Sequence, residues 1–302
     1  MRIAALGVLL AAAAALASCA ARADTTELAV AGALIRVEFT PGAFPDHGSE
    51  VLSWVRRSAQ IVQGYYGRFP ASPLDLRIIA ETGDGVQGGT TYANPDAYIR
   101  LRLGREVTAA QLKSDWVLVH EMTHLALPDT GEQHAWLSEG IATYVEGVAR
   151  VQAGNRSEAD VWAEELRAMP RGLPQADDRG MDHTHTWGRT YWGGAMFCLL
   201  ADVQIHQRSA NRQGLQDALR AILAQSGGLA ADWPIDKVLR IGDAATGTTV
   251  LEDLYAKFKD QPVSPDLVAL WRSLGVEAAG TSVSLNDSAP LAAVRQSIMR
   301  AR

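Results

Sequence analysis

Residues 120–124 read His-Glu-Met-Thr-His, with two histidines four positions apart and a glutamate directly after the first. In an α-helix, residues i and i+4 lie one turn apart on the same face. Both imidazoles can then bind one metal ion, and Glu121 lies beside the open position where a water molecule needs a general base. The motif therefore requires a helix here and predicts a zinc site held by His120 and His124. A surface helix that carries these residues by chance is the alternative interpretation.

The sequence around the motif supports a helix. Apolar residues recur at helical spacing over residues 113–127, and Thr108 with Gln111 forms a capping-box pattern just before them. Pro128 and Gly131 predict the end of the helix. We therefore expect one helix that carries the motif near its C-terminal end, in mostly apolar surroundings where unpaired imidazoles are disfavoured.

A zinc ion with two histidine ligands needs a third protein ligand. Glu139 is the expected one, because it lies near the start of a second predicted helix that follows a short turn and runs back antiparallel, ending before Gly154. Taken alone, Glu139 is equally well an ordinary first-turn glutamate favoured by the helix dipole. His134 in the turn is the rival third ligand. Glu146 is expected to support the site or to form a salt bridge rather than to bind the metal.

The motif followed by Trp-Leu-Ser-Glu-Gly-Ile-Ala at residues 136–142 resembles the gluzincins, zinc peptidases whose third ligand is a glutamate on the next helix. Tyr-Trp-Gly-Gly-Ala at residues 191–195 resembles a second segment of that clan, most closely in the glycyl aminopeptidase family. The resemblance spans about residues 60–275. It implies the α+β class and the gluzincin (thermolysin-like) catalytic fold, with a mixed β lobe followed by a mainly helical lobe.

The resemblance gives Tyr191 the role of donating a hydrogen bond to the oxyanion of the tetrahedral intermediate. A phenol suits this role because it is neutral at pH 7 and can donate to developing negative charge. Packing at a helix start is the alternative for Tyr191. His185 and Arg189 are expected to line the cleft, His185 near the oxyanion and Arg189 against a substrate carboxylate. A solvated loop with two incidental histidines, His183 and His185, is the other interpretation.

Gly88, Gly89 and Thr90 belong to a glycine-rich segment that precedes the zinc motif. In gluzincins an edge strand at this place pairs with the peptide backbone, and strand addition is a general way to bind an extended chain. A plain turn is the alternative. Aminopeptidase relatives carry a glutamate right after the glycine, which binds the α-amine of the substrate. This chain has Thr90 and Thr91 instead, and a hydroxyl is a poor partner for an ammonium. An endopeptidase is therefore at least as well supported as an aminopeptidase.

Composition and patterning bound the remaining expectations. The 302 residues are 47% hydrophobic and carry a net charge of −6, with no basic run, so nucleic acid is not an expected partner. No apolar stretch after the N-terminus is long enough for a transmembrane helix. We expect a β-rich lobe, a helical zinc-binding catalytic lobe and a loosely packed tail at residues 24–107, 108–277 and 278–302. The expected elements are a strand region, a helix and two strands at 28–40, 49–66, 74–80 and 97–103.

Residues 1–23 are typical of a signal peptide, because Arg2 precedes an apolar core. Ala-Arg-Ala at residues 21–23 fits ordinary cleavage, whereas the residues up to Cys19 resemble a bacterial lipobox that would lipidate Cys19 and anchor the chain to a membrane. Both interpretations predict export, with a bacterial periplasm as the destination. Cys198 stands alone in an apolar segment and is expected to be a small buried residue.

These observations predict a zinc-dependent peptidase with one Zn²⁺ ion, held by His120, His124 and Glu139, which acts on a peptide or protein substrate. Glu121 is the expected general base. Two alternatives remain open: a non-catalytic zinc protein that binds peptides or a cell-envelope partner, and a hydrolase of a non-peptide amide. Glu121 argues against the binding protein, because a binder needs no base beside the metal.

Overall fold

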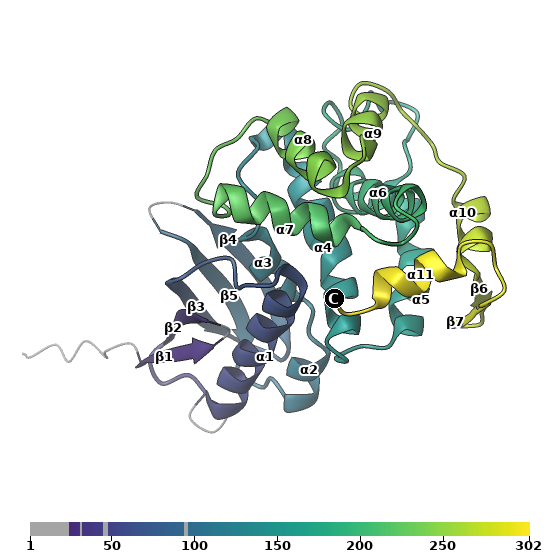
Figure 1. The fold of residues 1–302 in the computed structure, drawn as a ribbon. Helices are drawn as coiled ribbons and strands as arrows, with labels where there is room; N and C mark the ends of the chain where they lie inside the picture. The colour runs from purple at the N-terminus through teal and green to yellow at the C-terminus, as the bar shows by residue number, and fades with distance from the viewer. Residues whose placement is uncertain (1–23, 31, 45–47, 94–95) are drawn as a thin grey trace, which may run out of the picture.

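The computed structural model describes residues 24–30, 32–44, 48–93 and 96–302 (Figure 1). The predicted signal peptide, with both cleavage sites and Cys19, lies outside these residues. A sheet with one long helix comes first and a group of helices follows, which is the predicted α+β order. Among the described helices, none combines the length and apolar character needed to cross a bilayer.

The first lobe is a five-stranded sheet in the order β1-β2-β3-β5-β4. Its strands are β1 (Asp24–Val30), β2 (Ala33–Phe39), β3 (Leu74–Glu81), β4 (Val86–Tyr92) and β5 (Tyr98–Gly104). The two inner pairings are parallel and the two outer ones antiparallel, so the sheet is mixed. One strand region was expected over residues 28–40, but two strands form. Gly32, with φ of 75°, reverses the chain between them, a conformation that glycine adopts without strain.

Helix α1 (Gly48–Tyr66) confirms the helix expected at residues 49–66 and packs against β1 on one side and α3 and α4 on the other. Alternating residues of the central strands point into the same core. These fully buried residues include Ile35, Val37, Leu76, Ile78, Ile99 and Leu101. Burying a side chain of this size stabilises the fold by about 1.5–3 kcal/mol, so the lobe provides a firm base for the helix that carries the motif.

The helix that carries the motif is shorter than predicted. Two helices replace the single expected one: α2 (Ala109–Ser114) and α3 (Val117–His124). The capping box at Thr108 is confirmed, but it begins α2. Asp115 is extended and ends α2, and its carboxylate accepts hydrogen bonds from the backbone N–H groups of Val117 and Leu118, both at 3.1 Å. Asp115 therefore caps the start of α3, a break that the continuous apolar pattern concealed.

The second lobe is helical, and α4 runs through its middle between α3 and α6 (Figure 1). Its longer helices are α4 (Ala135–Gln152), α5 (Glu158–Ala168), α6 (Gly194–Arg208), α7 (Leu215–Ser226), α8 (Ile235–Thr246), α9 (Val250–Phe258) and α10 (Leu267–Leu274). Short turns of helix lie at η1 (Glu132–His134), η2 (Met169–Gly172) and the π-helical η3 (Arg189–Gly193). The last strand of the sheet ends just before α2, so secondary structure changes at the expected lobe boundary near residue 108.

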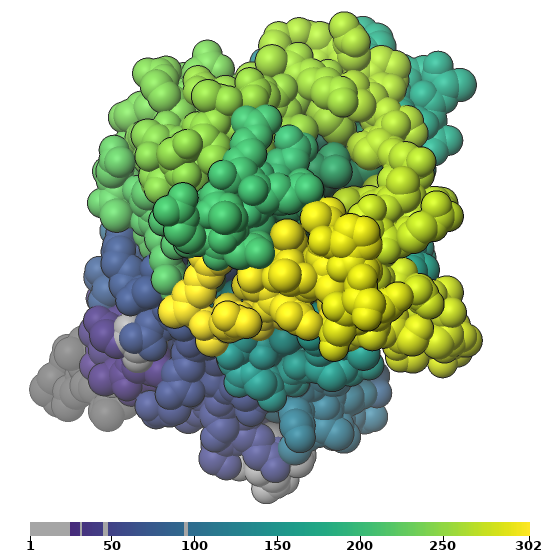
Figure 2. All heavy atoms as spheres, turned by 45° about the vertical axis from the view of Figure 1, so that its right-hand side comes forward, coloured from purple at the N-terminus to yellow at the C-terminus, as the bar shows by residue number. Residues whose placement is uncertain are grey.

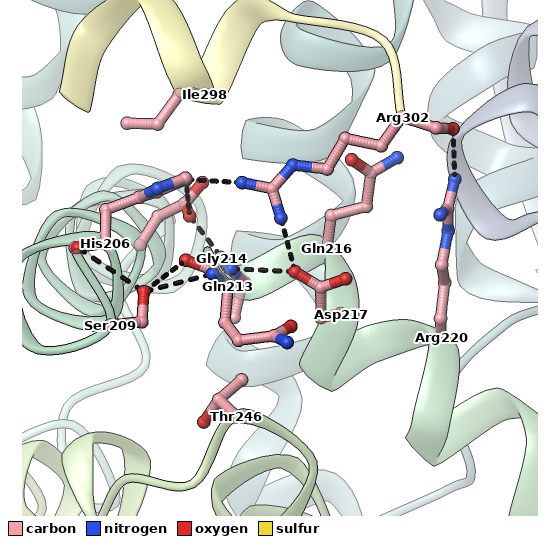
Figure 3. Close-up of polar contacts among 12 residues, drawn as sticks. His206, Ser209, Gln213, Gly214, Gln216, Asp217, Arg220, Thr246, Ile298 and Arg302 are labelled. Carbon is pink, nitrogen blue, oxygen red and sulfur yellow. Dashed lines mark hydrogen bonds and ion pairs between the residues drawn. The ribbon is translucent and has the colours of Figure 1, made fainter. Parts of the chain in front are cut away.

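The expectation of a loosely packed tail was wrong. Residues 278–302 include most of the hairpin β6 (Val276–Ala279) and β7 (Ser282–Leu285) and the helix α11 (Ala292–Met299). Helix α11 packs on α4 and α6 and buries Val294 and Ile298, and Figure 2 shows this segment in yellow across the surface. At the chain end, Arg302 contacts His206 and Asp217 and accepts a hydrogen bond from Arg220 (Figure 3). Small residues hid the amphipathic pattern of this helix.

Candidate metal centre

Three side chains converge on one point between α3 and α4. The Nε2 atom of His120 lies 3.2 Å from Oε2 of Glu139 and 3.2 Å from Nε2 of His124, which is itself 3.4 Å from that carboxylate oxygen. A tetrahedral ion with ligands at about 2.0–2.1 Å separates those ligands by about 3.3 Å. The spacing and the donor set, two imidazoles and a carboxylate, therefore fit a zinc ion.

The protonation of these groups also suits a metal. Burial lowers the pKa of His120, which favours the neutral imidazole that binds metals. Burial opposes a charge on Glu139, but hydrogen bonds from His120 and His124 outweigh it and lower the pKa of Glu139 to about 2. Burial also opposes a charge on His124, yet the hydrogen bond and charge of Glu139 raise its pKa overall. A proton on His124 therefore competes with the metal, and zinc binding should weaken in acid.

A hydrogen bond on the side away from the candidate metal position orients His124. The other nitrogen of His124, Nδ1, lies 2.9 Å from the hydroxyl of Ser138, the residue before Glu139 on α4. A hydrogen bond to the second ring nitrogen of a ligand histidine sets its tautomer and orientation. His134, the rival third ligand, instead contacts the carbonyl of Thr130 at 2.7 Å and the hydroxyl of Tyr255 at 3.3 Å. The geometry therefore favours Glu139 as the third ligand.

Glu121 faces the edge strand β4. Its carboxylate accepts a hydrogen bond from the hydroxyl of Thr91 at 2.7 Å. The strand approaches so closely that a Cβ atom on Gly89 would lie 2.6 Å from Cγ of Glu121 and 2.9 Å from Leu101. Only glycine fits at position 89 without displacing the glutamate, which explains the glycine that the sequence places before the two threonines.

Tyr191 reaches the same point from η3. A π-helical turn of this kind is rare and often occurs at functional sites. Its position follows from a close helix crossing: a Cβ on Gly140 would lie 2.2 Å from the backbone of Gly194, so the start of α6 packs directly beside Glu139. Burial and the carboxylates of Glu139 and Glu121 raise the pKa of Tyr191 to about 12. The phenol is therefore neutral and able to donate at ordinary pH.

A cavity of ≈380 Å³ joins these groups. Its lining residues include Gly89, Thr90, Thr91, His120, Glu121, His124, Glu139 and Tyr191. Of the predicted substrate-binding segment, Gly89 and Thr90 thus face the cavity. Gly88 precedes them on the same strand, with φ of 142°, and the side chain of Arg102 packs against it.

The segment before Tyr191 differs from the expectation. Arg189 is buried and its guanidinium lies 2.6 Å from the carboxylate of Asp178 and 2.7 Å from the carbonyl of Gly172. These partners hold η3 in place, so Arg189 is not available to a substrate carboxylate as predicted. His185 is exposed and does not line the cavity, and His183 contacts Asp260 at 2.9 Å. The alternative of a solvated loop fits both histidines better.

The sequence did not predict the roles that two polar residues, Ser138 and Thr91, have at the candidate site. Ser138 entered the sequence analysis only as part of the segment at residues 136–142, although its place directly before Glu139 is a signal that it supports the candidate metal site. Thr91 was interpreted only as the absence of an amine-binding glutamate. Its contact with Glu121 depends on how β4 lies over α3, which no local pattern records.

Comparisons with known proteins find the same fold. No protein-family model and no curated protein matches the chain. An aminopeptidase N family protein from Idiomarina loihiensis aligns with a TM-score of 0.66 and 15% identity, covering 84% of this chain and 49% of that one. An M1 zinc metallopeptidase from Deinococcus radiodurans aligns with a TM-score of 0.53 and 13% identity, covering 81% of this chain and 52% of that one. A mutant M1 zinc metallopeptidase from the same organism, bound to a Tyr-Ser-Ala substrate, aligns with a TM-score of 0.53 and 14% identity. It covers 81% of this chain and 53% of that one.

The chain therefore spans about half the length of these M1 zinc metallopeptidases, and it shares the mixed α/β fold of that part of them. This agrees with the resemblance to zinc metallopeptidases found in the sequence. The closer resemblance to the glycyl aminopeptidase family stays a prediction.

Proposed function

We propose that the protein is a zinc-dependent peptidase. The observation that carries the proposal is the convergence of His120, His124 and Glu139 at tetrahedral spacing, with Glu121 and Tyr191 lining the same cavity. A bound zinc ion would supply Lewis-acid polarisation of the scissile carbonyl and would make a water molecule more acidic. A shared fold with M1 zinc metallopeptidases supports the same assignment.

The side chains supply the proton transfers. Glu121 takes a proton from the attacking water and delivers it to the leaving amine, and its contact with Thr91 holds the carboxylate toward the cavity. Tyr191 donates a hydrogen bond to the oxygen on which negative charge develops. The raised pKa of Tyr191 keeps its proton available for that contact.

We propose further that the substrate is an extended peptide cut at an internal bond. β4 lies at one end of the strand order, so no other described strand pairs with its outer edge, where strand addition would seat a peptide. Thr91 is engaged by Glu121 and offers no carboxylate for a free α-amine. Two other carboxylates line the cavity, Asp129 and Glu132, but both are exposed, so an ammonium there would gain little.

Location follows as a proposal from the N-terminal sequence. The signal peptide pattern supports an exported protein of a bacterial periplasm, either free or anchored to the membrane through a lipid on Cys19. Mass spectrometry of the mature N-terminus distinguishes the two forms, because only the lipidated one retains Cys19.

The test is cleavage profiling of a mixed peptide pool by mass spectrometry, with zinc-loaded wild type beside Glu121→Gln. Internal cuts by wild type alone support an endopeptidase. Stepwise loss of N-terminal residues contradicts the endopeptidase proposal and shows that another group holds the amine. Absence of all cleavage, with zinc bound, would refute the peptidase and favour the binding protein or a non-peptide amide hydrolase. Glu121→Gln should retain zinc, which separates loss of the base from loss of the metal.

A further inference from the structure

A second cavity, of ≈300 Å³, also contacts His120 and Tyr191. These two residues line both cavities, so the second one adjoins the candidate metal site. It runs along α4, whose Glu139, Thr143 and Glu146 fall at helical spacing on one face. A substrate side chain next to the scissile bond would have direct access to it.

Aromatic rings connect the mouth of this cavity with the site. The ring centroids of Trp116 and His120 lie 5.5 Å apart, edge to face. The rings of His120 and Tyr191 stack with centroids 6.2 Å apart, and those of Tyr191 and Trp187 stack with centroids 5.8 Å apart. Trp116 and Trp187 are 53% and 59% exposed, which is unusual for tryptophan. Exposed aromatic rings around a cavity are typical of a binding surface, and their faces attract cations, guanidinium groups above all.

Three carboxyl groups line the cavity, and two of them have cationic partners. Glu146 pairs with Arg150 at 2.5 Å, and Glu164 pairs with Arg156 at 2.6 Å. Glu165 differs: it is 4% exposed, and its Oε2 atom is buried without a hydrogen-bond partner among the described residues.

The surroundings of Glu165 disfavour its charged form, an effect that a cation bound beside it would reverse. Burial, together with the neighbouring Glu164 and Glu146, raises the pKa of Glu165 to about 8, and only Arg156 acts in the opposite direction. Arg171 also lines the cavity, but it is exposed, so its charge is solvated at the rim. A buried acceptor of this kind destabilises the fold unless a ligand completes it.

We infer that this cavity is a specificity pocket for a substrate arginine, whose side chain packs against a tryptophan at the mouth and whose guanidinium pairs with Glu165. Arginine fits better than lysine because its planar group can stack and donate two hydrogen bonds at once. The inference rests on the proposed peptidase function, since it assigns the substrate preference of that same site. The hydroxyl of Thr143, also buried without a partner, offers the guanidinium a second acceptor.

The test uses two alanine-rich peptides that differ only in one residue, arginine or citrulline, which has the same shape without the charge. Wild type should cut beside arginine with a kcat/KM about 10- to 100-fold above that for citrulline. Glu165→Gln should bring the two peptides within about threefold of each other, while the exposed Glu106→Gln keeps the full preference. Equal cleavage of both peptides by wild type, or a full preference in Glu165→Gln, would overturn the inference.

A binding measurement separates this inference from the peptidase proposal. Calorimetric titration of the Glu121→Gln protein with each peptide needs no turnover. Tighter binding of the arginine peptide, lost on Trp187→Ala, supports the pocket even if wild type cleaves neither peptide, in which case the peptidase alone fails. Equal affinity for both peptides, or no binding, counts against the pocket. Trp187 is exposed, so its replacement tests the pocket even if Glu165→Gln does not fold.

Discussion

Removing the contact between Thr91 and Glu121 tests most directly how the chain positions its proposed base. Replacing Thr91 by valine keeps the size of the side chain and removes the hydroxyl, which lies 2.7 Å from the carboxylate of Glu121 and 2.9 Å from its backbone carbonyl. A hydrogen bond to a charged group contributes about 1.5–3 kcal/mol, and each 1.36 kcal/mol is tenfold in rate. We therefore expect kcat to fall about 10- to 100-fold in Thr91→Val, with zinc content and KM close to those of wild type.

The assay is steady-state cleavage of a fluorogenic peptide, with zinc measured on the same samples. Thr91→Ser restores the donor and should recover most of the rate. Thr82→Val is the control, because Thr82 is exposed and does not line the cavity. A kcat within twofold of wild type in Thr91→Val, or a loss explained by missing zinc, would refute the positioning role.

Three further predictions address the metal, the fold and pH. Ser138→Ala removes the hydroxyl behind His124 and should weaken zinc binding about 10- to 100-fold in chelator competition; unchanged affinity contradicts the contact. Gly140→Ala places a Cβ 2.2 Å from the backbone of Gly194 and should lower stability by about 1–3 kcal/mol in thermal unfolding; a wild-type Tm shows that the helices can separate freely. Burial raises the pKa of Glu165 to about 8, above its unfolded value, so the energetic cost of burying this carboxyl is smallest at low pH and grows as the pH rises toward 8. The free energy of unfolding, measured by urea titration, should therefore decline less between pH 5 and pH 8 in Glu165→Gln than in wild type. The difference should reach up to about 1.4 kcal/mol per pH unit. Parallel curves for the two proteins would show that Glu165 does not cause the pH dependence of stability.

The sequence predicted the elements that depend on local pattern. The helix at residues 49–66, the capping box at Thr108 and the order of a sheet before helices all follow from periodicity and caps. The convergence of the three candidate ligands was expected because helix geometry and a short turn restrict where Glu139 can lie.

Features that depend on contacts distant in sequence were missed. Thr91 contacts Glu121 only because β4 lies against α3. The Oε2 atom of Glu165 is buried without a hydrogen-bond partner among the described residues only because α5 packs on α4. Arg189 was expected at the substrate because it precedes Tyr191, yet the π-helical turn directs it toward Asp178. The break between α2 and α3 escaped notice because Asp115 interrupts the backbone and leaves the apolar pattern intact.

The packed C-terminal helix has a consequence for anyone who shortens this chain. A fragment ending at residue 277 retains every candidate ligand, and the sequence alone would recommend it as a minimal enzyme. It would also uncover the faces of α4 and α6 that α11 covers and remove the contacts of Arg295 with Glu158 and with the carbonyl of Leu274. Because α4 carries the candidate ligand Glu139, we expect a fragment to keep the geometry of the candidate metal site only if it extends through Met299.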